Sequence, residues 1–151
     1  MLDPGEEAPA FELTAHDGEP VSLADYEGQH VVLYFYPRAD TPGCTTEACG
    51  FRDAWDEFAD RDVAVLGVSN DPVENLQPFR EKYDLPFTLL SDPDCGVAEA
   101  YESAGEVEVD GDVYDVAHRN TYVIGPDGHV EAVYEDVSPD GHATELLADL
   151  A

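Results

Sequence analysis

In this 151-residue chain, residues 31–53, VVLYFYPRADTPGCTTEACGFRD, contain the clearest structural pattern. Residues 31–36 form an uninterrupted apolar run that a proline ends, which is typical of a buried β-strand. Thr41 is the expected N-cap of the helix that follows, with Pro42 as its first helical residue. Apolar residues then recur at helical spacing from about residue 44 to residue 59. The stretch therefore predicts a buried strand, a short loop and a helix.

The same alternation of apolar runs and helical patterns continues through the rest of the chain. Further strands are predicted at 63–68, 87–90, 119–124 and 129–134, and further helices at 71–83, 94–101 and 140–150. Asp71 and Asp94 are the expected N-caps of the first two of these helices, and Gly-Pro-Asp-Gly at 125–128 predicts a hairpin turn. Residues 103–116 are polar and are expected to form in part a hairpin. The order predicts an α/β fold, a central mixed sheet flanked by helices on both faces, in a single domain over residues 1–151.

The composition is strongly acidic, because 35 Asp and Glu against six Lys and Arg give a formal charge of −29. Six cations cannot neutralise a row of phosphates, which argues against nucleic-acid binding and against adhesion to an anionic membrane surface. The carboxylates are scattered along the chain, so we predict adaptation to high salt and a halophilic source. A non-enzymatic interpretation, a cation-binding protein or an acidic decoy for a basic partner, stays open at this point.

The N-terminus and the cysteine content indicate the compartment. The first residues have neither the basic start nor the apolar stretch of a secretory signal, and no apolar run reaches the ~20 residues of a membrane span. We therefore expect a cytoplasmic protein. Three cysteines, an odd number in a reducing compartment, indicate reactive thiols rather than a structural disulfide framework. A zinc site built from Cys44, Cys49 and a histidine would lack its second pair of ligands, so no metal is expected.

Cys44 lies in the first turn of the predicted helix. Backbone N–H groups there have no intrahelical partner, and the helix dipole favours negative charge. A cysteine in such a position, more so beside an arginine, favours the reactive thiolate form. Cys44 falls on the same helix face as Ala48 and Phe51, so its sulfur is expected to be partly shielded by the core. The alternative is a buried cysteine with a purely structural role.

Cys49 follows Cys44 by five residues. In an intact helix the two Cα atoms would be roughly 8.7 Å apart, beyond the ~7 Å limit for a disulfide. A bond between the two cysteines therefore requires the first turns of the helix to unwind. Thr45, Thr46 and Gly50 form helices poorly, which lowers the cost of that unwinding. Cys49 as a spare thiol is the alternative that geometry alone leaves open.

The residues Pro37-x-x-x-Thr41-x-x-Cys44 match the active-site motif of the peroxiredoxins. The longer run over residues 36–53, the opening GEEAPAFEL at 5–13 and the late RNTYVI at 119–124 resemble the Q-type group of that family, also called the bacterioferritin comigratory protein group. The similarity extends over nearly the whole chain. The resemblance implies a thioredoxin-like peroxiredoxin fold.

The resemblance also implies a thiol-dependent peroxidase that reduces hydrogen peroxide and organic hydroperoxides without a metal or organic cofactor. Cys44 would attack the peroxide and become a sulfenic acid, which Cys49 would resolve as an intramolecular disulfide. A thioredoxin-like donor would reduce that disulfide, and the family resemblance favours a monomer. Thr41 would orient the peroxide, Pro37 would shield the sulfur from water, and Arg119 would stabilise the thiolate and the charge that develops on the peroxide oxygens.

Four other residues have smaller expected roles. Glu47 is expected to pair with an arginine and hold it in place, whereas Arg38 and Arg52 are expected only to balance nearby acids. Cys95 is unusual for the family and is expected to be a thiol outside the cycle, although resolution of Cys44 by Cys95 stays open. The rival enzymatic interpretation, a general thiol–disulfide oxidoreductase, normally uses Cys-x-x-Cys rather than the Cys-x-x-x-x-Cys spacing present here.

Overall fold

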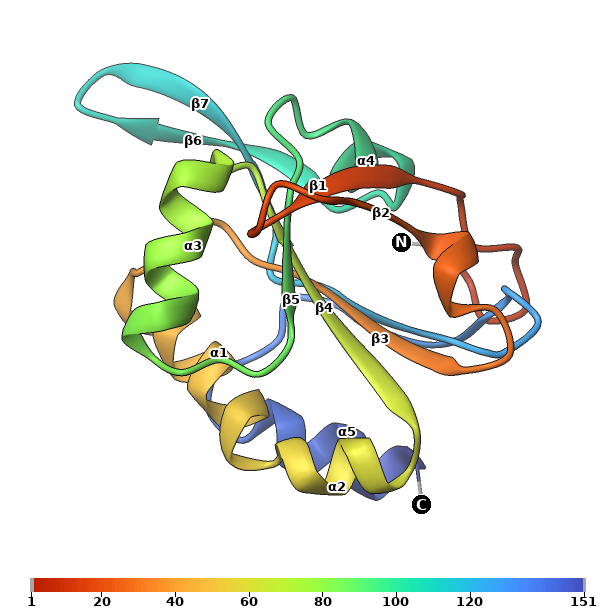
Figure 1. Ribbon diagram of the computed structural model, residues 1–151. Helices are drawn as coiled ribbons and strands as arrows, with labels where there is room; N and C mark the ends of the chain where they lie inside the picture. Colours follow the sequence, from red (N-terminus) through yellow and green to blue (C-terminus); the bar gives the residue numbers. More distant parts are fainter. Residues whose placement is uncertain (1, 151) are drawn as a thin grey trace.

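The computed structural model describes residues 2–150, without the side chains of residues 107, 109, 114 and 115. A seven-stranded mixed sheet with the order β2-β1-β5-β4-β3-β8-β9 forms its centre (Figure 1). The strands of this sheet are β1 (Glu12–Ala15), β2 (Pro20–Ser22), β3 (His30–Phe35), β4 (Val63–Ser69), β5 (Thr88–Ser91), β8 (Thr121–Ile124) and β9 (Val130–Tyr134). The interior strand β3 is parallel to β4 and antiparallel to β8. The predicted α/β class with a central mixed sheet is confirmed.

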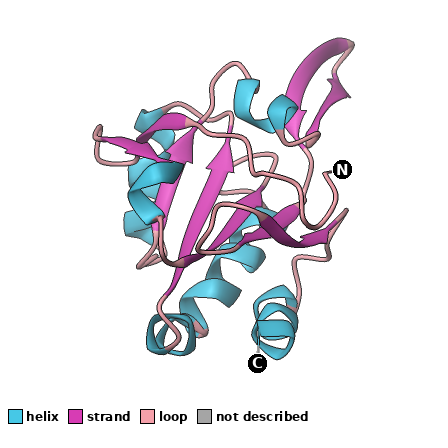
Figure 2. Cartoon of the chain, turned by 90° about the vertical axis from the view of Figure 1, so that its right-hand side faces the viewer, coloured by secondary structure: helices cyan, strands magenta, loops and turns pink. Residues whose placement is uncertain are grey.

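Helices cover both faces of the sheet, as predicted. They are η1, a 3₁₀ helix (Leu23–Tyr26), α1 (Pro42–Asp53), α2 (Trp55–Asp60), α3 (Val73–Lys82), α4 (Gly96–Ala100) and α5 (His142–Leu150). Side chains alternate along β3, so that Val32 and Tyr34 pack on one face with residues of α1, α2, α3 and α5. Val31 and Leu33 pack on the opposite face with residues of α4 and the N-terminal segment. Figures 1 and 2 show helices on both sides of the sheet.

The helix predicted from about residue 44 to residue 59 is in fact two helices. Ala54, with φ −98° and ψ 5°, ends α1 and precedes α2. Phe58, four residues after Ala54, is fully buried. Because one residue alone separates the two helices, the helical spacing of apolar residues is nearly intact, which is why the pattern predicted one continuous helix.

Asp71 is not the N-cap of α3, contrary to the prediction, because Pro72 occupies that position and α3 begins at Val73. The buried Asp71 carboxylate instead accepts hydrogen bonds from the backbone N–H of Ala39 (2.6 Å) and from the hydroxyl of Ser69 (2.8 Å). Asp71 thereby ties the loop that follows β3 to the end of β4.

The N-cap position of α4 is occupied by Cys95, in the left-handed conformation (φ +59°), and not by Asp94 as predicted. The Asp94 carboxylate accepts a hydrogen bond from the N–H of Gly96. The buried Asp92 carboxylate accepts two further bonds, from the N–H groups of residues 97 and 98. Two aspartates therefore share the capping that the sequence assigned to one.

The hairpin expected within residues 103–116 is present as β6 (Ala104–Val109) and β7 (Asp112–Ala117), which project from the body of the molecule (Figure 1). Its two turn residues, Asp110 and Gly111, both have positive φ, as a tight type I′ turn requires. The edge strand β2, its neighbour β1 and the helix η1 were not predicted. Among the described residues, none of the helices combines the length and the apolar character of a membrane span.

Candidate active site

Cys44 lies just beyond the carboxyl end of β3, in the first turn of α1. Thr41 is the N-cap residue, with an extended backbone (φ −100°, ψ 156°), and Pro42 is the first helical residue, both as predicted. The first bond of the helix runs from the N–H of Thr45 to the C=O of Thr41 (2.8 Å). The N–H groups of Gly43 and Cys44 therefore belong to the turn that has no intrahelical acceptors. Cys44 itself is 1% exposed, so its sulfur is shielded as expected.

The loop before Cys44 contains the other two residues of the motif. The Thr41 hydroxyl makes no capping bond to α1; it donates a hydrogen bond to the C=O of Arg38 at 2.8 Å. This bond folds residues 38–41 into a compact turn three residues before the cysteine. Pro37 is half-buried at the start of the same turn. The structure thus brings Pro37 and Thr41 into the loop that leads to the sulfur.

Arg119 reaches the sulfur from a distant part of the chain. It lies in the connection between β7 and β8 and not on a strand, contrary to the prediction, because β8 begins at Thr121, where the pairing with Tyr34 starts. Its Nη2 is 3.5 Å from Cys44 Sγ. Its Nη1 is 3.0 Å from Oε1 of Glu47. One guanidinium therefore bridges the thiol and a carboxylate one turn further along α1.

Glu47 is the buried acid of this site, with a fully buried side chain. Its contact with an arginine, as predicted, is confirmed. Burial raises the pKa of Glu47 to about 7, against the opposing effect of the Arg119 guanidinium. Among the described residues no hydrogen-bond partner lies within reach of Glu47 Oε2. The site thus contains a carboxyl group that titrates near neutral pH beside the cysteine.

Gly43 has a steric role that sequence reasoning missed. A Cβ atom placed on Gly43 would lie 3.0 Å from Nη2 of Arg119 and 3.8 Å from Cγ of Pro139. The absence of a side chain lets the guanidinium approach the first turn of α1. The glycine was visible in the sequence, but nothing in the sequence showed what it makes room for.

The three cysteines are distributed over two regions of the fold. Cys44 and Cys49 lie in the same uninterrupted helix, α1, and both are free thiols, with Cys49 half-buried. Cys95 is buried at the start of α4. Cys44 belongs to the core cluster on one face of the sheet and Cys95 to the cluster on the other. The sheet therefore lies between Cys44 and Cys95.

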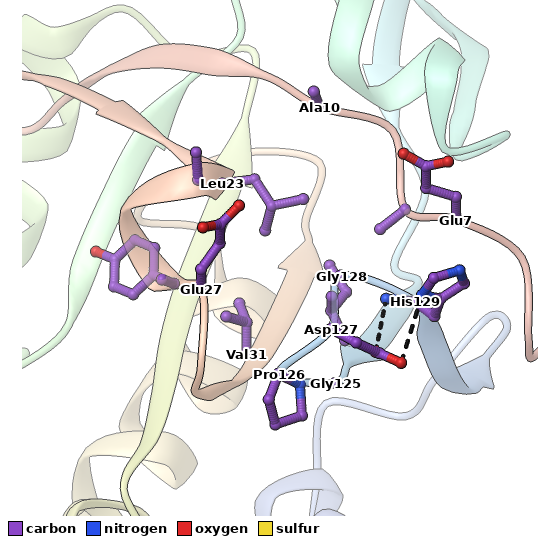
Figure 3. Close-up of a pocket in the computed structure, with 14 residues that line it drawn as sticks. Glu7, Ala10, Leu23, Glu27, Val31, Gly125, Pro126, Asp127, Gly128 and His129 are labelled. Carbon is purple, nitrogen blue, oxygen red and sulfur yellow. Dashed lines mark hydrogen bonds and ion pairs between the residues drawn. The ribbon is translucent and has the colours of Figure 1, made fainter.

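A cavity of about 330 Å³ lies away from this site, at the amino end of β3 (Figure 3). It is lined by the N-terminal segment around Glu7, by η1, by Val31 and by the β8–β9 turn around Asp127 and His129. Its fourteen lining residues include none of Pro37, Thr41, Cys44, Glu47 and Arg119. The cavity is therefore separate from the candidate active site.

Comparison with known proteins agrees with this geometry. Residues 4–133 match the model of the AhpC/TSA family. The chain is 48% identical to Peroxiredoxin Bcp of Escherichia coli strain K12 over 146 residues, which cover 97% of this chain and 94% of that protein. It belongs to the Bcp-type peroxiredoxins. A putative peroxiredoxin bcp of Coxiella burnetii is 46% identical over 149 residues and 99% of both chains.

Solved structures support the same assignment. This peroxiredoxin superposes on peroxidoxin BcpB from Mycobacterium tuberculosis with a TM-score of 0.88, at 38% identity over 99% of this chain and 97% of that chain. The bacterioferritin comigratory protein of Xanthomonas campestris gives a TM-score of 0.89, at 33% identity over 98% and 97% of the two chains. The predicted thioredoxin-like fold is thus confirmed.

Membership of this family makes the chain an enzyme, a thiol peroxidase whose substrates are peroxides and whose reductant is of the thioredoxin type. The non-enzymatic interpretation of the acidic composition is therefore wrong. The rival interpretation, a general thiol–disulfide oxidoreductase, is likewise wrong, because the family is one of peroxidases.

Proposed function

We propose that this peroxiredoxin completes its cycle with two cysteines of one helix, Cys44 as the peroxidatic and Cys49 as the resolving residue. The Cys44 thiolate attacks one oxygen of the peroxide, the O–O bond breaks, and the second oxygen leaves as an alcohol or water after it gains a proton. The resulting sulfenic acid condenses with the Cys49 thiol, which forms a disulfide and releases water. A thioredoxin-like dithiol reduces that disulfide and is itself oxidised.

The observation that carries the assignment of Cys44 is its contact with the Arg119 guanidinium at 3.5 Å. A fixed cation beside the sulfur favours the thiolate and stabilises negative charge on the departing oxygen. Arg119 is held in this position by the bond to Glu47. Thr41 orients the peroxide for in-line attack, and Pro37 shields the sulfur from bulk water.

Helix geometry supports Cys49 as the resolving residue, provided that α1 unwinds locally. The two cysteines are separated by roughly 8.7 Å between Cα atoms in an intact helix, beyond the reach of a disulfide. The first turns of α1 are suited to unwinding, since the Thr46 hydroxyl donates to the C=O of Pro42 (2.9 Å), a bond that competes with the helical ladder. Cys95 lies across the sheet, so its approach to Cys44 would require disruption of the core.

Peptide mapping under non-reducing conditions, after one equivalent of hydrogen peroxide, tests this cycle. We expect a Cys44–Cys49 disulfide in the wild type and in the matched control Cys95→Ser. The Cys49→Ser variant should instead retain a sulfenic acid, which a dimedone probe would label. A Cys44–Cys95 link in the wild type, or an unlinked sulfenic acid, would overturn the role of Cys49.

The substrates we propose are hydrogen peroxide and organic hydroperoxides. The Xanthomonas campestris relative supports the second class, since its structure is described in terms of alkyl peroxide reduction activity. We propose thioredoxin itself as the reductant and a monomer as the active form. Peroxide-dependent oxidation of NADPH, coupled through thioredoxin and its reductase, tests thioredoxin as the reductant. Light scattering on the enzyme as it elutes from a size-exclusion column tests the monomeric state.

A further inference from the structure

Both ends of the segment that carries the two cysteines of α1 are bonded to the end of α3, Asp40 to Lys82 and Tyr83 and Arg52 to Tyr83 alone. Upstream of the cysteines, the Asp40 carboxylate lies 3.2 and 3.1 Å from Nζ of Lys82 and accepts a hydrogen bond from the Tyr83 hydroxyl (2.9 Å). Downstream, Nη1 of Arg52 donates to the C=O of Tyr83 at 2.9 Å. We call Lys82 and Tyr83 the α3 anchor. The helix that must unwind lies between its two attachment points.

Within the α3 anchor, Tyr83 is held in place by the core. The Tyr83 ring is half-buried and packs edge-on against Phe79, with ring centroids 5.5 Å apart. Tyr83 is also the C-cap residue of α3, so its carbonyl belongs to the helix end, where a cation such as Arg52 is favoured. The Tyr83 hydroxyl, and after it Lys82, lower the pKa of Asp40, so that this residue remains an ionised acceptor.

The loop before Cys44 has few other attachments to α3. A cavity of about 320 Å³ lies between loop residues 38–40 and the side of α3 that carries Asn75, Pro78 and Phe79. Besides its bonds to the α3 anchor, this loop is bonded to the segment that precedes α3, through the hydrogen bond from the N–H of Ala39 to the Asp71 carboxylate. The attachment of Asp40 is therefore placed to control movement of the loop.

We propose that Lys82 and Tyr83 are positioning residues: both hold Asp40, Tyr83 also holds Arg52, and together they limit how readily α1 unwinds to bring Cys44 to Cys49. This inference rests on the proposed resolving role of Cys49. The sulfenic acid of Cys44 has two fates: the Cys49 thiol converts it to a disulfide and water, or a second peroxide oxidises it to a sulfinic acid and is reduced to water. Only the first fate requires unwinding, so a weaker attachment of Asp40 increases the share of disulfide.

Two variants, Lys82→Met and Tyr83→Phe, weaken the attachment of Asp40 and leave the Arg52 bond in place. Tyr134→Phe is the matched control, because it removes another tyrosine–aspartate hydrogen bond, from Tyr134 to Asp149, that does not involve α1. Separate samples of each reduced protein receive a series of increasing excess doses of hydrogen peroxide, and mass spectrometry measures the ratio of sulfinic acid to disulfide at each dose. Both products come from the same sulfenic acid, so their ratio is independent of the rate of the first oxidation.

We expect the peroxide concentration that gives equal amounts of the two products to rise roughly two- to five-fold in Lys82→Met and in Tyr83→Phe, the range set by exposed ion pairs and hydrogen bonds. It should stay at the wild-type value in Tyr134→Phe. Unchanged ratios in both α3 anchor variants, or a shift toward sulfinic acid, would overturn the inference. If instead the wild type forms no Cys44–Cys49 disulfide at low peroxide, the proposed function fails, whatever the variants do.

Discussion

Replacing Glu47 with glutamine keeps the shape of the side chain and an oxygen that can accept from Arg119, but it removes the ionisable group. Burial raises the pKa of Glu47 from an ordinary value of 4.5 to about 7, with Arg119 acting in the opposite direction. The folded protein therefore binds this proton more tightly than the unfolded chain does. The stability that results is fully present below about pH 4.5 and is lost as the pH rises through about 7.

The size of this effect follows from the two pKa values. A difference of one between the folded and unfolded pKa values corresponds to about 1.4 kcal/mol, so the difference for Glu47 corresponds to about 3 kcal/mol in the free energy of unfolding. The ion pair with Arg119 therefore offsets only part of the cost of burying the Glu47 carboxylate, whose Oε2 has no hydrogen-bond partner among the described residues. Above neutral pH we expect the Glu47→Gln variant to be more stable than the wild type, although it lacks the ion pair with Arg119.

Urea unfolding at constant ionic strength, from about pH 5 to about pH 8, measures this difference. The free energy of unfolding of Glu47→Gln minus that of the wild type should rise across this range by roughly 2–3 kcal/mol. The control Glu57→Gln removes a carboxylate from an exposed position of α2 and reports the effect of net charge alone. A difference between Glu47→Gln and the wild type that stays constant with pH would show that burial does not raise the pKa of Glu47.

Three further predictions concern close packing and salt. Gly67→Ala would place a Cβ 2.8 Å from the Tyr34 ring, so we expect a loss of about 1–3 kcal/mol in urea unfolding; wild-type stability would contradict this contact. Gly43→Ala should keep or raise the free energy of unfolding, since alanine favours a helix by up to ~1 kcal/mol over glycine. Its Cβ should nevertheless displace the Arg119 guanidinium, so we expect the reaction with peroxide to slow roughly three- to ten-fold in competition kinetics. A wild-type rate in that variant would show that the guanidinium adjusts freely. If the acidic surface is an adaptation to salt, the midpoint of thermal unfolding should be higher in molar salt than without it. Equal midpoints would contradict a halophilic source.

Local features of the chain were predicted well because their causes are local. The apolar run that became β3 and the N-cap at Thr41 depend on neighbouring residues, so their positions were correct to within a residue. The role of Asp71 was predicted wrongly because its true partner, the N–H of Ala39, lies 32 residues earlier in the chain. The strands β1 and β2 were missed because they are short and, with Ala15 as their one buried residue, lack a continuous apolar pattern.

Patterns in the sequence were enough to predict the class of fold, the place of Cys44 in the first turn of a helix, and, through the resemblance to the peroxiredoxins, the chemistry. The groups that surround the sulfur of Cys44 became known from the tertiary contacts. Arg119 meets Glu47 and Cys44 across 72 and 75 residues of chain, and the sheet separates Cys44 from Cys95. Such contacts depend on the order of strands in the sheet and on which face each side chain takes. Short-range periodicity predicts elements, but it does not contain that order, because strand order is set by burial summed over the whole core.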